Sequence, residues 1–246
     1  MIIKILGSSS SSNCYLLQAN NGKTLLIECG VDFKEVKKAL NFDISNVSGC
    51  LISHEHKDHA GYVQKVLEAG IDCYMSKGTK EVLELNHHRA IILGEFQKIS
   101  IGGYKVMTFD TKHDCRQPVG FLIHHKEMGL MLFATDTYYL KYNFEGLNQI
   151  FIECNYAKDI LNNNVELGII NNKLKNRTLR SHFELENVKT FLKSNDISSV
   201  RNICLLHLSD RNSDAERFKR EIEELTDKNV VVADNGVEID LNLFSF

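Results

Sequence analysis

The sequence predicts an α/β fold in which two β-sheets lie between outer helices. Short apolar segments of strand length alternate with amphipathic segments of helix length along the chain, and these two periodicities indicate strands and surface helices. Strands at hairpin-like spacing dominate the first half, whereas helices and strands mix in the second. This order fits two sheets with helices packed outside them. We expect residues 1–246 to form one domain.

Each expected element follows from a local pattern. Apolar runs bounded by turn residues predict strands at residues 2–6, 14–18, 24–28, 49–53, 72–76, 104–110, 120–125, 130–136, 150–154, 202–208, 230–234 and 237–241. Helical spacing of apolar residues predicts helices at 32–40, 60–69, 78–85, 157–174, 183–194 and 213–225. The serine-rich segment 7–13 joins the first two strands and is expected to be a tight loop at one end of the sheets.

Composition limits the class of protein. The opening MIIKIL lacks the features of a signal or transit peptide, and no apolar run approaches the roughly 20 residues of a membrane helix. The seven cysteines are odd in number and lie mostly in apolar segments, which indicates buried thiols in a reducing cytoplasm. A formal net charge of −3 excludes a globally basic nucleic-acid binder, although a local basic patch stays open.

The segment SHEHKDHAG, residues 53–61, concentrates titratable side chains between an apolar strand and a helix. Packing does not require them, because His, Asp and Glu are mostly exposed residues. Alternate residues of an extended segment point the same way, so His54 and His56 should share one side, with Asp58 and His59 following where the chain turns. Imidazole and carboxylate ligands suit zinc or manganese, and two clusters suit two ions about 3.5–4 Å apart.

The motif HEHKDH resembles the H-x-H-x-D-H signature of the metallo-β-lactamase fold, and the resemblance extends over nearly the whole chain. It implies a four-layer αββα sandwich with mixed sheets and two divalent metal ions, zinc or alternatively manganese, at one edge. The implied ligands of one metal are His54, His56 and His113, those of the other are Asp58, His59 and His207, and Asp136 would bridge the two.

One position departs from the resemblance. The family usually has an aspartate in the second hairpin that supports the metal ligands, whereas this chain has Glu28 in LLIECG. The longer side chain can reach a ligand histidine, since such carboxylates orient metal-bound imidazoles. Alternatively, Glu28 ends a strand with its carboxylate in water.

The segments LGSSSSSNCYLL, HDCRQPVGF, ATDTYY and HLSDRN resemble the YycJ/WalJ-like proteins most and the ribonuclease Z group more remotely. The latter resemblance implies proton transfer by a Glu and His pair, here Glu153 and His182, which join Asp58 as the expected catalytic residues. His182 lies in SHFE, which also reads as a helix capping box with Ser181 as the N-cap. Ribonuclease Z relatives are dimers, so the resemblance also implies a homodimer.

Both groups of relatives act on phosphodiesters, so the resemblance implies metal-assisted phosphodiester hydrolysis of a nucleic acid or nucleotide. Lys175, Arg177 and Arg180 precede His182 and are expected to hold phosphates; a solvated helix face is the alternative. A nuclease acting on DNA or RNA ends is the first expectation. Cyclic pyrimidine nucleotides, which phage-encoded family members destroy, are the second. Thioester or lactone hydrolysis, and a metal-dependent binding module, are the alternatives of other classes.

Overall fold

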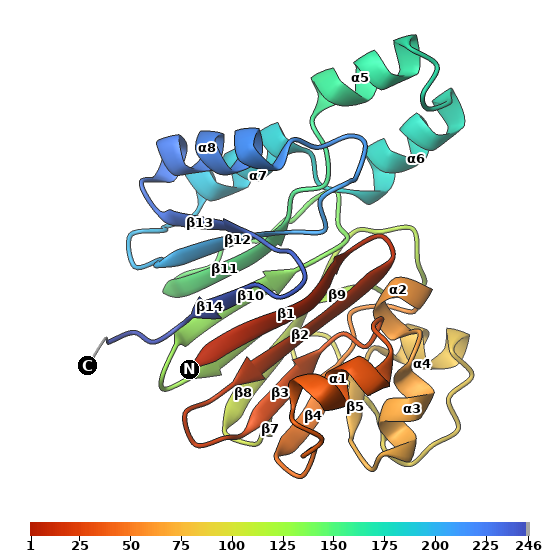
Figure 1. Ribbon diagram of the computed structural model, residues 1–246, viewed down its shortest axis with the longest axis vertical. Helices are drawn as coiled ribbons and strands as arrows, with labels where there is room; N and C mark the ends of the chain where they lie inside the picture. Colours follow the sequence, from red (N-terminus) through yellow and green to blue (C-terminus); the bar gives the residue numbers. More distant parts are fainter. Residues whose placement is uncertain (245–246) are drawn as a thin grey trace.

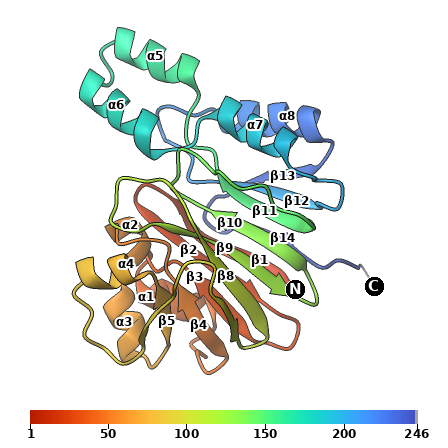
Figure 2. The same ribbon diagram turned by 180° about the vertical axis from the view of Figure 1, so that it is seen from behind.

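A computed structural model describes residues 1–244 and contains two seven-stranded sheets packed face to face (Figures 1 and 2). The first sheet has the order β14 (Glu238–Asp240), β1 (Ile2–Ser9), β2 (Ser12–Gln18), β3 (Thr24–Ile27), β4 (Val47–Leu51), β5 (Cys73–Met75) and β6 (Ala90–Ile92). The second has the order β13 (Asn229–Val232), β12 (Asn202–Leu206), β11 (Leu147–Glu153), β10 (Gly129–Ala134), β9 (Val119–His125), β8 (Tyr104–Asp110) and β7 (Lys98–Ile101). Both sheets are mixed: each has antiparallel pairs on one side and parallel pairs on the other.

Helices cover the two outer faces. The first sheet is covered by α1 (Phe33–Ala39), α2 (Lys57–Ala60), α3 (Val63–Glu68) and α4 (Lys77–Val82), and the second by α7 (Leu185–Ser194) and α8 (Ala215–Thr226) (Figure 1). Apolar clusters join α1 and α3 to the first sheet, and α7 and α8 to the second. The predicted α/β class, with four layers and two mixed sheets, is confirmed.

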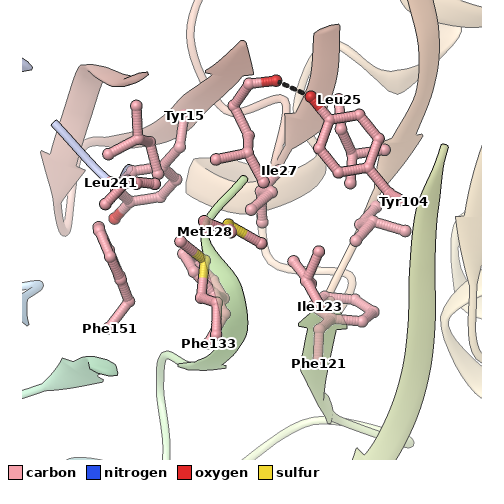
Figure 3. Close-up of a cluster of buried hydrophobic side chains, with 14 of the residues drawn as sticks. Tyr15, Leu25, Ile27, Tyr104, Phe121, Ile123, Met128, Phe133, Phe151 and Leu241 are labelled. Carbon is pink, nitrogen blue, oxygen red and sulfur yellow. Dashed lines mark hydrogen bonds between the residues drawn. The ribbon is translucent and has the colours of Figure 1, made fainter. Parts of the chain in front are cut away.

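The core between the sheets holds the two halves of the chain in a fixed relation. Aromatic and aliphatic side chains from both sheets interdigitate there, among them Tyr15, Ile27, Phe121 and Phe133 (Figure 3). The hydroxyl of Tyr104, on the second sheet, donates to the carbonyl of Leu17 on the first at 2.8 Å. Because protein interiors are close-packed, this core fixes the loops at the sheet edges relative to one another.

The structure corrects several expected boundaries. The helix expected at 157–174 is two helices, α5 (Lys158–Glu166) and α6 (Asn172–Ser181). Gly168 breaks it with a φ of +70°, and the Asn171 side chain caps the second helix by accepting the N–H of Leu174. The helix expected at 60–69 begins earlier and is divided into α2 and α3, while β6 and β7 were not anticipated. Both strands are short edge strands with exposed residues, so their hydrophobic pattern is weak.

Helices α5 and α6 form a hairpin that projects from the sandwich in both views (Figures 1 and 2). Serines 10 and 11 form the two-residue turn between β1 and β2, so the expected tight loop is present. All seven cysteines lie in the described residues and are free thiols. Among the residues described, none of the helices has the length and apolar character needed to cross a membrane.

Candidate metal centre

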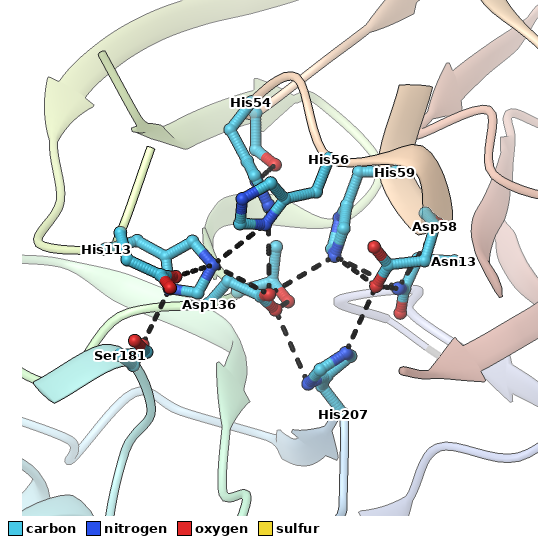
Figure 4. A network of polar contacts seen from close by, with 12 residues as sticks. Asn13, His54, His56, Asp58, His59, His113, Asp136, Ser181 and His207 are labelled. Atoms are coloured by element: carbon cyan, nitrogen blue, oxygen red, sulfur yellow. Dashed lines mark hydrogen bonds and ion pairs between the residues drawn. The ribbon is translucent and has the colours of Figure 1, made fainter. Parts of the chain in front are cut away.

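The predicted metal ligands converge at one edge of the sandwich (Figure 4). The segment that carries His54 and His59 follows β4, whereas His113, Asp136 and His207 follow β8, β10 and β12. In the second sheet these three strands run in the same direction, so their carboxyl ends meet at the same edge. The face-to-face packing of the sheets then brings the first-sheet segment opposite them.

One half of the centre consists of His54, His56, His113 and Asp136, whose ligand atoms all lie within 4.8 Å of one another. His113 Nε2 is 3.1 Å from His56 Nδ1 and 3.4 Å from Asp136 Oδ2. The Nδ1–H of His113 donates to the carbonyl of Ser181 at 2.8 Å. A carbonyl only accepts, so in the neutral ring this bond leaves the Nε2 lone pair facing the centre.

The other half consists of Asp58, His59, Asp136 and His207, again within 4.8 Å. His59 Nε2 is 3.2 Å from Asp58 Oδ2 and 3.4 Å from Asp136 Oδ2. His207 Nε2 is 3.5 Å from Asp58 Oδ2, and its Nδ1 is 3.5 Å from Asp136 Oδ1. Asp136 therefore belongs to both halves and occupies the position expected of a bridging carboxylate.

The donor atoms fit a divalent metal. Within the described residues, His54 Nε2 and His207 Nε2 are buried without a hydrogen-bond partner. Buried polar atoms normally have partners. A cation bound in each half of the centre would satisfy the nitrogen that lies in that half. A set of imidazoles and carboxylates suits zinc or manganese.

The histidines of the centre fall into two groups that differ in the direction of their pKa shifts. Burial lowers the pKa of His54 and His113. Burial would also lower the pKa of His59 and His207, but the Asp136 charge and hydrogen bonds to carboxylates outweigh it and raise both, that of His207 to about 10. Burial in turn would raise the pKa of Asp136, yet attraction to His207 and His59 holds it well below its usual value. Without metal, cationic imidazoles thus balance the carboxylates in one half of the centre.

Backbone geometry at the centre is unusual. Glu28, Asp136 and His207 have φ values of 63°, 42° and 54°, in the left-handed region that non-glycine residues rarely adopt. Such strain concentrates at functional sites. At Gly30, an added Cβ would lie 1.6 Å from the carbonyl oxygen of Asp58, so only glycine permits this approach to the ligand segment.

Glu28 is fully buried behind the ligands. Its two carboxylate oxygens lie 3.2 and 3.3 Å from the N–H of Ser53, which donates to them, and Oε2 is 3.7 Å from His59 Nδ1. Of the two alternatives for this position, the one with the carboxylate in water is wrong. The longer side chain reaches the far side of a ligand histidine.

Glu153 and His182 form a pair beside His207. The Nδ1–H of His182 donates to Glu153 Oε1 at 2.6 Å, and its ring stacks on that of His207 with centroids 5.5 Å apart. Burial would lower the pKa of His182, but the charge and hydrogen bond of Glu153 raise it. Both side chains also lie close enough to Asp136 and His207 to form a third group of potential ligand atoms.

The expected capping box at SHFE is wrong. Ser181 is the last residue of α6, and the N-cap of α7 is Glu184, whose side chain accepts the N–H groups of Glu186 and Asn187. His182 therefore follows the C-terminal end of a helix instead of starting one. The helix macrodipole at that end favours a protonated, cationic imidazole, whereas a position at the start of a helix would disfavour it.

A cavity of about 520 Å³ opens over the centre. Arg177 lines this cavity, and its Nε donates to Asp114 Oδ2 at 2.8 Å. Lys175 and Arg180, from the same basic run, are not among the lining residues. Of the basic residues expected to hold phosphates, Arg177 lines the cavity, whereas Lys175 and Arg180 do not.

Solved structures show the same architecture over the full length. The metallo-β-lactamase fold protein YhfI from Bacillus subtilis is 14% identical with a TM-score of 0.74, covering 97% of this chain and 98% of that chain. The chain has the metallo-β-lactamase fold. Human tRNase Z, short form, is 13% identical with a TM-score of 0.63, covering 98% of this chain and 99% of that one.

Two proteins and one family model match this metallo-β-lactamase-fold protein in sequence. Exodeoxyribonuclease YycJ of Bacillus anthracis is 25% identical over 239 residues, covering 91% of this chain and 88% of that protein. Residues 6–88 match the family model "Anti-Pycsar protein Apyc1". The Anti-Pycsar protein Apyc1 of Bacillus phage 010DV004 is 38% identical over 55 residues, 22% of this chain and 21% of that protein.

Two asparagines and one arginine were not anticipated at the site of this metallo-β-lactamase-fold chain. The amide of Asn13 contacts Asp58 Oδ2 at 3.3 Å and His59 Nε2 at 3.1 Å. The amide of Asn155 donates to the carbonyl of His207 at 2.7 Å. Arg211 lines the cavity. Asn13 and Arg211 lie in segments that carried the resemblance, beside turns, which is the signal that points to them, whereas Asn155 lies outside those segments.

Proposed function

We propose that this chain is a two-metal phosphodiesterase that acts on the ends of DNA or RNA. The observation that carries the proposal is the pair of donor groups that share Asp136, beside the Glu153 and His182 pair, at the floor of an open cavity. Two-metal sites of this kind serve in-line displacement at phosphorus. The resemblance to an exodeoxyribonuclease over 91% of the chain supports the choice of polynucleotide ends.

Zinc is the proposed metal, because imidazole nitrogens predominate among the donors; manganese is the alternative. When bound, the two ions would activate a water molecule and offset the negative charge that develops on the phosphate.

The chain's own residues would position that water and move a proton. The pKa of Asp58 is lowered because the nearby His207 and His59 rings outweigh its burial, so its carboxylate stays ionised and would accept a hydrogen bond from the attacking water. Glu153 Oε1 holds the Nδ1–H of His182. This bond leaves the Nε2 of His182 available in the cavity, where it would donate a proton to the leaving oxygen.

The test is hydrolysis by the metal-loaded protein of single- and double-stranded oligonucleotides labelled at either end. We expect stepwise shortening from one end, lost in Asp136→Asn and retained in Lys175→Ala, which alters a residue outside the cavity lining. A lactone and a thioester are assayed in parallel. Hydrolysis of these in preference to every phosphodiester would contradict the proposal.

A cyclic-nucleotide phosphodiesterase is the second candidate. The match of residues 6–88 to the Anti-Pycsar Apyc1 model favours it, and a cavity of about 520 Å³ lies within the roughly 300–1,000 Å³ range of small-molecule sites. Hydrolysis of 3′,5′-cyclic CMP and cyclic UMP is compared with that of the oligonucleotides at equal concentrations of phosphodiester bonds. A kcat/KM more than a hundredfold higher for the cyclic nucleotides would replace the first candidate by the second.

A further inference from the structure

The α5–α6 hairpin is held over the metal centre by specific ties. Arg177 forms an ion pair with Asp114, and the carbonyl of Ser181 accepts the Nδ1–H of the ligand His113. The buried side chain of Asn164 on α5 donates to the carbonyl of Arg211 at 2.8 Å. These ties position one face of the hairpin against the cavity, although the hairpin projects from the sandwich (Figure 2).

The face of the hairpin that lines the cavity is partly apolar. Ile170 and Leu174 line the same cavity as His56, His182 and His207. Ile170 packs into the small apolar cluster that joins the two helices of the hairpin and is buried, whereas Leu174 is 43% exposed. An exposed leucine in the lining of this cavity leaves apolar surface in water.

The rest of the cavity lining is polar and includes both cationic side chains and the carboxylates of Asp58, Asp136 and Asp210. Lys57 and Arg211 line it, and neither has an ion-pair partner among residues 1–244. A cavity that combines cationic groups, a phosphodiester-cleaving centre and one small apolar wall is suited to an anion with a flat, weakly polar part. The area of two aliphatic side chains matches a single planar ring better than a long acyl chain.

We propose that Ile170 and Leu174 form the wall on which the nucleobase next to the reacting phosphate lies. The inference rests on the proposed function and adds a specificity-determining contact to it. The base packs on Leu174 while its phosphate reaches the metal centre, and Arg177 and Arg211 lie along the same cavity.

The test compares two ligands that differ only in the base: thymidine 5′-monophosphate and 2-deoxyribose 5-phosphate. Their binding to the metal-loaded protein is measured by calorimetry, for the unchanged protein and for Leu174→Ala. We expect the Kd of thymidine 5′-monophosphate to rise about five- to tenfold, the effect of returning about 50 Å² of apolar surface to water. The Kd of deoxyribose 5-phosphate should not change.

The matched control is Leu167→Ala, because Leu167 is 66% exposed on the same hairpin but does not line the cavity. It should change neither Kd. Ile170 is left unchanged because its removal would damage the hairpin's own apolar cluster. Sedimentation of both variants reports whether Leu174 instead contacts a second copy of the chain.

Three outcomes would overturn the inference: equal weakening of both ligands, no weakening of either, or a change of oligomeric state in Leu174→Ala alone. Failure of the proposed function has a different signature. In that case no polynucleotide or cyclic nucleotide is hydrolysed, although Leu174→Ala still weakens thymidine 5′-monophosphate and spares deoxyribose 5-phosphate.

Discussion

Metal uptake should release protons from one half of the centre and not from the other. In the metal-free protein, the pKa of His207 is raised to about 10 and that of His59 is also raised. The His207 ring therefore carries a proton at pH 8, which a metal ion must displace to bind, and His59 keeps its proton to a higher pH than a free imidazole does. The lowered pKa values of His54 and His113 leave these rings neutral at that pH.

The size of the pH dependence of metal affinity follows from the number of protons displaced. Binding at the half that contains His59 and His207 displaces the His207 proton, so its apparent affinity should rise about tenfold per pH unit for this proton, and more steeply where His59 is also protonated. The rise should continue until the pH approaches the His207 pKa of about 10. Binding at the half that contains His54 and His113 should gain little above neutral pH.

Calorimetric titration of the metal-free protein with Zn²⁺, in two buffers of different ionisation enthalpy, counts the protons released. His207→Gln should release one proton fewer per chain than the unchanged protein. His124→Gln removes an exposed histidine on β9 and should release the same number. If His207→Gln left the count unchanged, or if metal affinity did not vary between pH 7 and 9, the charge assignment of the centre would be refuted.

The remaining predictions concern single side chains. Asp136→Asn should bind less than one metal ion per chain, because the carboxylate contributes to both halves; elemental analysis that finds two ions would exclude a bridge. His182→Ala should keep its metal but lose about 10²–10⁴-fold in rate on a substrate with an alkoxide leaving group, and less with p-nitrophenolate; equal losses would remove the proton-donor role. Arg177→Ala should weaken oligonucleotide binding and flatten its salt dependence, whereas Lys175→Ala should change neither, since only Arg177 lines the cavity.

The donors of the centre were accessible to sequence reasoning because they occupy recognisable local positions. His54, His56, Asp58 and His59 fall in one short motif between a strand and a helix, whereas His113, Asp136 and His207 were assigned through the family resemblance. The motif is local, so it is readable without knowing which segments pack together.

Side chains whose role depends on a distant segment were not predictable in the same way. The carboxylate of Glu28 looks equally suited to water and to a histidine until β3 and β4 are paired and Ser53 lies beside it. Arg177 and Lys175 are two residues apart in one basic run, yet only the orientation of α6 decides which of them lines the cavity. SHFE satisfies a capping pattern, but the end of α6 at Ser181 excludes it.

The sequence by itself determined most strands, most helices and the residue types that can bind metal, because hydrophobic periodicity and short motifs are properties of neighbouring residues. The tertiary structure alone decided that Glu28 is buried behind His59 and that His182 follows a helix C-terminus, and it brought together the donors around Asp136 that the family resemblance implied. The donors grouped around Asp136 come from segments up to about 150 residues apart, from His54 to His207. Their distances are set by the packing of one sheet on the other, which no local pattern encodes.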